Sequence, residues 1–386
     1  MPTSVLHVSP SFPRRLDDPV APFLLDLLRA QRAFGWDASA IAVHDEGLPT
    51  RQELAGVPVR RVRYGPERWE VLAYRGGGHG GLRSPLHALL LPGLVLMLVW
   101  SVRSEVRRRR PDVVHAHWIL PGGLAAALLR KKSRGRLVLT MHGTDVELAA
   151  GKLKPLARWI VGRVDAVVAV SEPLARRAEA VLGLDAGSVG VARLPLPVDL
   201  APAPFPDGPR RVLAAGRASP EKGFDVLVAA LARAEAHGIG ATLVVEGPTR
   251  PDLEADVANS GLGDRVTFLP LLPREELFDQ MRAHHLVVVP SRTEGLGMVA
   301  LEALALGRPV VASAVGGLPS VVVDGVDGAL VPSDDPGALA RAIATVPLTT
   351  PTAAAAESHR PAAIVAAHAA AYAVPMPTRT PEVPRA

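Results

Sequence analysis

Cysteine is absent from all 386 residues of the sequence. Its absence excludes disulfide bonds, cysteine-zinc sites, iron-sulfur clusters and cysteine nucleophiles. The first residues also lack the basic stretch and apolar core of a signal peptide, so we expect none. A reducing, cytoplasmic setting fits both absences. At the usual domain size of about 150 residues, this length predicts two domains, each able to bury a core.

Acidic residues are outnumbered only in the first half of the chain. Residues 1–200 contain 28 Lys and Arg against 18 Asp and Glu, whereas residues 201–386 contain 15 against 20. Basic domains commonly bind nucleic acid, anionic membrane or acidic substrates, and charge alone does not choose among these partners.

Long uncharged runs are rare, and residues 84–102 are the exception. They carry no formal charge and approach the roughly 20 residues of a membrane span. His87, Pro92 and Gly93 interrupt the run, and five arginines follow it at 103, 107, 108, 109 and 110. These features favour a helix packed on the first sheet over a span.

Short runs rich in Val, Ile and Leu alternate with segments of helical period, which is typical of βα units around a parallel sheet. We therefore predict an α/β protein with two Rossmann-like, doubly wound parallel-sheet domains. The expected strands are 5–9, 38–43, 57–63, 112–116, 136–141 and 165–170, then 211–215, 241–246, 265–269, 286–290, 309–313 and 328–331. The expected helices include 22–34, 223–237, 251–260, 274–283, 296–306 and 361–373.

Six prolines between residues 193 and 211 prevent a helix or central strand from continuing through that segment. The expected division is a first domain at 1–194, a linker at 195–209 and a second domain at 210–346. Residues 347–386 would add a helix and a Pro-rich tail that we expect to be disordered.

The strongest chemical signal is the segment 289–313, where a buried strand at 286–290 leads through a polar turn into a helix. Small residues and free N–H groups at a helix start, beside the carboxyl edge of a parallel sheet, favour phosphate. Glu294 and Glu302 are eight residues apart, about 12 Å along a helix, so they would meet different parts of one elongated ligand. The helix start is Gly295, Leu296, Gly297 and Met298.

A second signal lies between Gly216 and Gly223, again after a strand and before a helix. Arg217 can fork to two phosphate oxygens and Lys222 supplies a compact positive charge. The alternative is that both are solvated loop charges. The presence of both segments in one chain favours a diphosphate site.

Together these segments resemble the family 4 retaining glycosyltransferases, whose GT-B fold has two Rossmann-like domains facing across a cleft. The resemblance covers roughly residues 3–345, and its specific parts are 216–223 and 291–317. It implies that Arg217 and Lys222 bind the diphosphate of a nucleotide-sugar donor of UDP or GDP type. It also implies that Glu294 contacts the donor sugar, that the N–H groups of residues 295–298 hold phosphate, and that Glu302 binds the ribose hydroxyls.

The segment His142-Gly143-Thr144-Asp145 follows an expected strand and resembles the family's motif in the first domain. The resemblance implies that His142 contacts the donor sugar or the acceptor, and adds it to Glu294, Arg217 and Lys222 as an expected catalytic residue. His115 and His117 alternate on an expected strand. We expect them to face opposite sides, which disfavours a metal site.

Two departures from the family pattern stand out. The loop at 10–21 lacks the glycine pair of many members, and Arg14 or Arg15 is expected to substitute in contacting the diphosphate. One glycine of the family's Gly-x-Gly-Pro is also missing, because this chain has Val245-Glu246-Gly247-Pro248.

The resulting hypothesis is transfer of a hexose-type sugar, with retention of configuration, to a hydroxyl acceptor. Fixed cations and helix N–H groups would stabilise the charge on the leaving diphosphate, so we expect no divalent metal and no cofactor. The alternatives are a nucleotide-sugar epimerase and a non-enzymatic sugar-nucleotide sensor. A dinucleotide dehydrogenase is disfavoured, because no Gly-x-Gly-x-x-Gly follows the first strand.

The pattern of apolar and charged residues predicts one further partner, which would bind away from the donor site. The apolar run at 86–100 with its adjoining arginines predicts reversible docking of the first domain on anionic membrane, at the inner face of the plasma membrane. The alternative is that the run is wholly buried on the sheet. Nucleic acid is not an expected partner.

Overall fold

The computed structural model describes residues 2–74, 89–130, 134–197, 200–352 and 354–376. The chain divides into two compact units: unit 1 comprises Met1–Pro195 and the segment that begins at His359, and unit 2 comprises Leu196–Ser358. The expected linker at 195–209 therefore belongs almost entirely to unit 2. Residues 359–376, the described part of the last segment, belong to unit 1.

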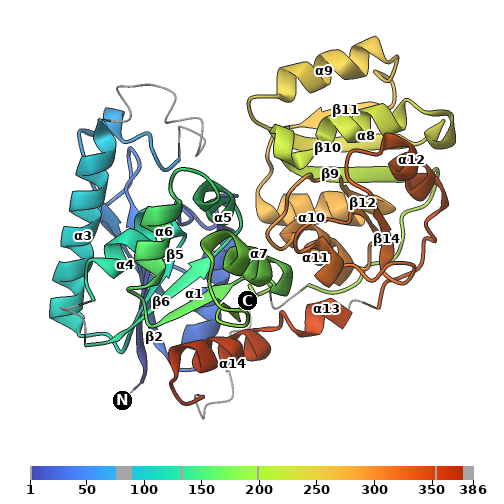
Figure 1. The fold of residues 1–386 in the computed structure, drawn as a ribbon. Coiled ribbons are helices and arrows are strands. Elements are labelled where there is room, and N and C mark those ends of the chain that lie inside the picture. Colours follow the sequence, from blue (N-terminus) through green and yellow to red (C-terminus); the bar gives the residue numbers. More distant parts are fainter. Residues whose placement is uncertain (1, 75–88, 131–133, 198–199, 353, 377–386) are drawn as a thin grey trace. The chain divides into compact units, whose positions relative to one another are not determined.

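Unit 1 is built on an eight-stranded sheet of order β3-β4-β2-β1-β5-β6-β7-β8. Figure 1 labels its strands β2, β5 and β6. All neighbours pair in parallel except β3 and β4, which are antiparallel. The strands are β1 (Ser4–Ser9), β2 (Asp37–Val43), β3 (Arg51–Leu54), β4 (Val57–Val62), β5 (Val113–His117), β6 (Arg136–Met141), β7 (Ala166–Ala169) and β8 (Gly190–Val191). The order reverses between β1 and β5, which is where such sheets bind ligands.

The helices of unit 1 bury one face each. In α1 (Pro22–Ala33), Pro22 presets the first turn, Leu24, Leu27 and Leu28 are buried, and Gly35 follows with a positive φ of 91°. The others are α3 (Leu90–Arg109), α4 (Leu124–Ala127), α5 (Thr144–Ala149), α6 (Lys154–Val161), α7 (Glu172–Leu182) and α14 (Pro361–Tyr372), with short helical turns η1 (Glu67–Trp69) and η3 (Ile119–Gly123).

Helix α14 is part of the unit 1 core although it follows the whole of unit 2 in sequence (Figure 1). Val365, Ala369 and Tyr372 pack with residues of β1, β5 and β6, and the Tyr372 ring lies tilted against Trp36 with 5.4 Å between ring centroids. His359 bonds the Leu194 carbonyl through Nδ1 at 2.6 Å. This burial explains why the helix belongs to unit 1; residues 377–386 of the expected tail lie outside the described residues.

Unit 2 has a six-stranded, fully parallel sheet of order β11-β10-β9-β12-β13-β14. Its strands are β9 (Arg211–Arg217), β10 (Gly240–Glu246), β11 (Val266–Leu269), β12 (Leu286–Val289), β13 (Val310–Ser313) and β14 (Gly328–Val331). Its helices are α8 (Phe224–Leu231), α9 (Arg250–Asn259), α10 (Arg274–Arg282), α11 (Met298–Ala305), α12 (Pro336–Thr345) and α13 (Ala354–Glu357), with turns η4 (Pro220–Lys222), η5 (Ala234–Ala236) and η6 (Leu318–Ser320). The order reverses between β9 and β12.

Arg308 explains why the proline-rich segment belongs to unit 2. Its side chain is fully buried and donates to the carbonyls of Ala203, Pro204 and Met281. A buried guanidinium must satisfy its five N–H donors, and here the backbone of the segment supplies acceptors. The segment therefore packs on unit 2 while remaining irregular.

Helix α3 carries most of the uncharged run, whose residues 84–88 lie outside the described part of the chain. Leu94 and Leu98 are buried, and Leu94 packs with Val43 of β2 and Tyr64. Among the described residues, no helix is both long and apolar enough to cross a membrane. The expected helix packed on the first sheet is therefore confirmed.

Candidate active site

Lys222 and Glu294 lie together at the point where the strand order of unit 2 reverses. Lys222 ends the short turn η4 after β9, and Glu294 lies in the loop after β12. The Lys222 Nζ is 2.7 Å from Glu294 Oε2, which also accepts from the Ser291 hydroxyl at 3.3 Å. Two segments 72 positions apart in sequence thus place a cation and a carboxylate at one end of the sheet.

Glycines allow the loops to approach this closely. Gly223 has a φ of 64°, and a Cβ added there would lie 2.0 Å from the Pro290 carbonyl oxygen. Gly316 has a φ of 53°, and its added Cβ would lie 1.8 Å from the Glu294 carbonyl oxygen. Larger residues would push the Glu294 loop away from β9 and β13.

Arg292 ties the same two loops together and was not anticipated from the sequence. It donates to both carboxylate oxygens of Asp225 at 2.9 and 2.6 Å, and to Asp334 at 2.6 Å. Hydrogen bonding from Arg292 lowers the pKa of Asp225. Its backbone N–H also donates to the Glu221 carbonyl at 2.8 Å. A bidentate Arg–Asp pair fixes geometry, so Arg292 positions Lys222 and Glu294.

Helix α11 begins at Met298, two residues later than expected. Gly297 takes a left-handed φ of 96° and forms the N-cap, so residues 294–297 are loop and not helix. Helical rise therefore does not apply to the whole stretch from Glu294 to Glu302, and the 12 Å spacing calculated from it loses its basis. Leu296 is 4 % exposed, so its side chain is not available to a ligand. The first N–H groups of a helix have no intrahelical acceptor, which suits them to phosphate oxygens.

Glu302 lies inside α11 and is only 6 % exposed. Its Oε1 accepts from Arg274 Nη2 at 2.7 Å. Arg274 is the first residue of α10, and no sequence motif marked it. Carboxylate oxygens accept strong hydrogen bonds from hydroxyl groups.

Arg217 is the last residue of β9. Its side chain is exposed and makes no hydrogen bond or ion pair with the residues that the structure describes. The structure therefore does not bring Arg217 into the Lys222–Glu294 pair, and its side chain remains accessible at the same strand end.

His142 follows β6 in unit 1 and is held by aromatic neighbours. Its ring stacks on Trp118 with centroids 4.2 Å apart, and Phe23 lies 5.5 Å away. Burial lowers its pKa to about 3, so the ring is neutral. Asp145 has a structural role: its carboxylate accepts from the backbone N–H groups of residues 119, 142, 143 and 146. These bonds fix the loop that carries His142.

The expectation for His115 and His117 is wrong. Residues i and i+2 of a strand share a face, and the two rings lie 4.2 Å apart with His7 of β1 beside them. The ring nitrogens of the three histidines come close enough to suit a metal ion. Each of these nitrogens, however, already has a hydrogen-bond partner within the protein: His117, Gln31, Tyr372, Thr140, His7 and His142. A metal would have to displace those partners.

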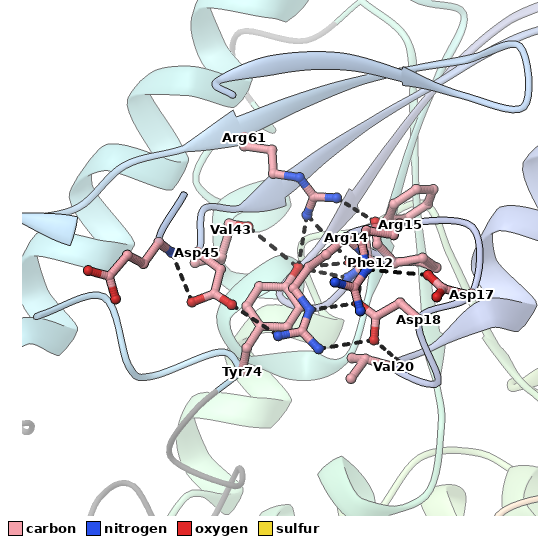
Figure 2. A network of polar contacts seen from close by, with 12 residues as sticks. Phe12, Arg14, Arg15, Asp17, Asp18, Val20, Val43, Asp45, Arg61 and Tyr74 are labelled. Atoms are coloured by element: carbon pink, nitrogen blue, oxygen red, sulfur yellow. Dashed lines mark hydrogen bonds and ion pairs between the residues drawn. The ribbon is translucent and has the colours of Figure 1, made fainter. Parts of the chain in front are cut away.

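The loop after β1 is braced by a polar network (Figure 2). Arg14 Nε donates to Asp18 Oδ2 at 2.6 Å, and its Nη1 donates to Asp45 at 3.1 Å. The bond from Asp18 raises the pKa of Arg14. Buried Arg61 donates to the carbonyls of Phe12 and Pro13 from the other side. Two carboxylates thus neutralise Arg14. Arg15, with a side chain 75 % exposed, pairs with the exposed Asp17 at 3.3 Å.

Comparison with known proteins identifies the family. The models of Glycosyltransferase Family 4 and of Glycosyl transferases group 1 match residues 20–201 and 209–346. D-inositol 3-phosphate glycosyltransferase of Acidothermus cellulolyticus is 33% identical over 340 residues, covering 77% of this chain and 70% of that enzyme. The chain belongs to the family 4 glycosyltransferases.

Further family 4 relatives carry the same name. The enzyme of Kribbella flavida is 34% identical over 79% of this chain and 77% of its own length. That of Mycolicibacterium smegmatis is 35% identical over 61% of this chain, a match that spans only 59% of that protein. The chain is thus a glycosyltransferase by its similarity to enzymes of that activity.

Solved structures agree with the GT-B fold. Sucrose-phosphate synthase from Thermosynechococcus elongatus matches with a TM-score of 0.71 and 25% identity, covering 88% of each chain. HepE from Anabaena, in complex with UDP-glucose, matches with a TM-score of 0.65 and 21% identity over 88% of each chain. The two parallel-sheet units of this chain have the GT-B fold.

Proposed function

We propose that this glycosyltransferase transfers a hexose-type sugar from a nucleoside-diphosphate donor to a hydroxyl acceptor, with retention of configuration and without a divalent metal. The observation that carries the proposal is the Lys222–Glu294 pair at the strand reversal of unit 2, beside the start of α11. An anionic ligand at such a reversal meets backbone N–H groups and a positive helix end.

The roles follow from the chemistry of the leaving group. As the bond between sugar and diphosphate breaks, negative charge grows on the diphosphate. Lys222, which Glu294 holds, and the N–H groups at the start of α11 are in place before the reaction and stabilise that charge, and the exposed Arg217 adds a second cation. Glu294, whose carboxylate already bonds Lys222, contacts the donor sugar, and Glu302 binds the ribose hydroxyls.

Similarity supports the substrate class. HepE is described in complexes with UDP and with UDP-glucose, which favours a uridine donor, and the curated relatives are named for transfer to D-inositol 3-phosphate, a hydroxyl-bearing acceptor. A cytoplasmic location would give access to nucleotide sugars.

The test is a donor screen followed by turnover. UDP- and GDP-sugars are compared for thermal stabilisation of the protein, and the stabilising donor is then incubated with a panel of hydroxyl acceptors that includes D-inositol 3-phosphate. We expect nucleotide release that requires acceptor, and a product with the donor's anomeric configuration. Conversion of the donor sugar without acceptor would indicate an epimerase, and binding without any turnover would indicate a sensor.

We also propose that helix α3 docks unit 1 on anionic membrane. Leu89, Leu96 and Trp100 are 75, 67 and 57 % exposed, at helical spacing on the face opposite buried Leu94 and Leu98. Arg103 and Arg107 continue that face, as i+3 and i+7 from Trp100. Apolar side chains followed by cations suit the interface between lipid tails and anionic headgroups. Co-sedimentation with anionic but not neutral vesicles tests the proposal.

A further inference from the structure

A chain of hydrogen bonds runs from His142 through the core of unit 1. His142 Nε2 bonds His117 Nδ1 at 3.1 Å, His117 Nε2 bonds His7 Nδ1 at 2.9 Å, and His7 Nε2 bonds Gln31 Oε1 at 2.8 Å. Gln31 Nε2 donates to the Tyr372 hydroxyl at 3.0 Å. Beyond His142, these side chains are at most 1 % exposed. The proposed function uses only the first member of this chain.

The Gln31 amide gives the chain a direction. Its oxygen can only accept, so His7 must donate from Nε2. A neutral imidazole has one N–H, which leaves His7 Nδ1 as an acceptor, and His117 must then donate to it from Nε2. Because His117 is also neutral and has its proton on Nε2, its Nδ1 must accept, and His142 therefore donates to it from Nε2. The pKa of His7 and of His142 is lowered to about 3 by burial, in keeping with neutral rings.

The hydrogen bonds that continue from the amide nitrogen of Gln31 are consistent with this direction. The Tyr372 oxygen accepts from the amide and its hydroxyl then donates to His115 Nδ1 at 2.7 Å. His115 Nε2 in turn donates to the Thr140 hydroxyl oxygen at 2.6 Å. Six hydrogen bonds thus point in one direction through seven groups, which come from β1, α1, β5, β6, α14 and the loop after β6. If the oxygen and nitrogen of the Gln31 amide exchanged places, the donor and the acceptor of every hydrogen bond in this chain would also exchange.

We propose that Gln31 is a positioning residue that acts through His7 and His117 to hold His142 in its Nε2-protonated tautomer. His142 Nδ1, which makes no hydrogen bond to the described residues, is then an acceptor for a hydroxyl of the bound sugar or acceptor. That last step rests on the proposed glycosyl transfer. The tautomer itself depends only on unit 1.

The experiment is long-range proton-nitrogen NMR on full-length protein labelled with ¹⁵N-histidine at pH 7.5. The His142 signals are assigned by their loss in His142→Asn. In the wild type we expect protonated Nε2 and unprotonated Nδ1. Gln31→Met keeps the volume but removes the acceptor, and should give a mixed or reversed tautomer. Gln31→Glu again presents an oxygen acceptor to His7 Nε2, and should keep the wild-type tautomer.

Several results would overturn the proposal: a wild-type His142 protonated at Nδ1, a doubly protonated ring, or a tautomer in Gln31→Met identical to the wild type. If a variant does not fold, the wild-type spectrum still overturns the proposal when His142 is not protonated at Nε2 alone. With a turnover assay in hand, Gln31→Met should lower kcat/KM about 10-fold and Gln31→Glu should restore most of it. Because the spectrum needs no substrate, failure of the transfer hypothesis leaves the tautomer result intact.

Discussion

Glu294 and Glu302 occupy different surroundings although one sequence segment carries both. Glu294 lies in a loop and bonds Lys222, so its charge is next to the cation expected at the reacting bond. We expect Glu294→Gln to lower kcat at least about 100-fold while KM for the donor changes less than about 3-fold. Steady-state nucleotide release gives both constants. A change in KM without a change in kcat would show that Glu294 does not act in the chemical step.

Glu302 is buried against Arg274, and its role is expected in binding. Glu302→Gln should weaken donor affinity about 10-fold, because neutral acceptors form weaker hydrogen bonds to ribose hydroxyls than a carboxylate does. Titration calorimetry measures this directly. Glu254→Gln is the matched control, since Glu254 pairs with Arg250 at 2.8 Å on the exposed face of α9. An unchanged affinity in Glu302→Gln would mean that the ribose lies elsewhere.

Substitutions on the exposed face of helix α3 test the membrane proposal, with control substitutions elsewhere in unit 1. Arg103→Glu with Arg107→Glu should abolish vesicle binding, because each cation contributes about 1 kcal/mol at an anionic surface. Arg176→Glu, an exposed arginine on α7, is the control for charge. Trp100→Ala should also weaken binding, whereas Trp159→Ala, another partly exposed tryptophan of unit 1, should not.

Salt distinguishes electrostatic docking from aggregation of the protein. Binding should fall as ionic strength shortens the screening length. Sedimentation that is insensitive to lipid charge and salt, or equal losses in the control variants, would contradict docking through α3.

Elements with a strong apolar pattern were predictable from sequence. Strands β6 and β14 begin and end at the expected residues, because buried runs bounded by polar residues define both ends. Strands β3 and β8 were missed: β3 is a four-residue antiparallel edge strand and β8 has two residues. Helix α11 begins two residues after its predicted start, because Gly297 adopts a left-handed conformation that the apolar periodicity does not reveal.

The sequence predicted only those site residues that belong to a short, recognisable motif. Lys222 and Glu294 each follow a recognisable strand, and the structure brings them together. Arg292 and Arg274 act through partners on other elements, so no local pattern marked them. The assignment of α14 to unit 1 depends on contacts made more than 200 residues away, such as that between Gln31 and Tyr372.

Acid should destabilise unit 1 more than unit 2, in which burial lowers the pKa of only two described histidines, His284 and His285. Burial lowers the pKa of His7 and His142 to about 3 and that of His368 to about 4, and lowers the pKa of His115 and His117 as well. These rings bind protons on unfolding, so the stability they contribute is complete above about pH 6.5 and is lost as pH falls below it. Between pH 7.5 and 5.5 the loss should be roughly 1 kcal/mol for each histidine.

The tryptophans make this measurable, because all five lie in unit 1, at 36, 69, 100, 118 and 159. In urea titrations, the midpoint from tryptophan fluorescence should fall between pH 7.5 and 5.5. The later part of the circular dichroism transition, which includes unit 2, should move less. A fluorescence midpoint that stays constant over this range would show that the buried histidines are not neutral in the folded unit.

The central claim is that fixed cations at the strand reversal of unit 2, not a metal ion, stabilise the leaving diphosphate. The most direct measurement is the rate of acceptor-dependent nucleotide release in excess EDTA, for the wild type, Lys222→Ala, Arg217→Ala and the exposed control Arg341→Ala. We predict full wild-type and Arg341→Ala activity in EDTA, and losses of at least about 100-fold in Lys222→Ala and Arg217→Ala. Loss of wild-type activity in EDTA that magnesium or manganese restores, or near-normal rates without Lys222, would contradict the account.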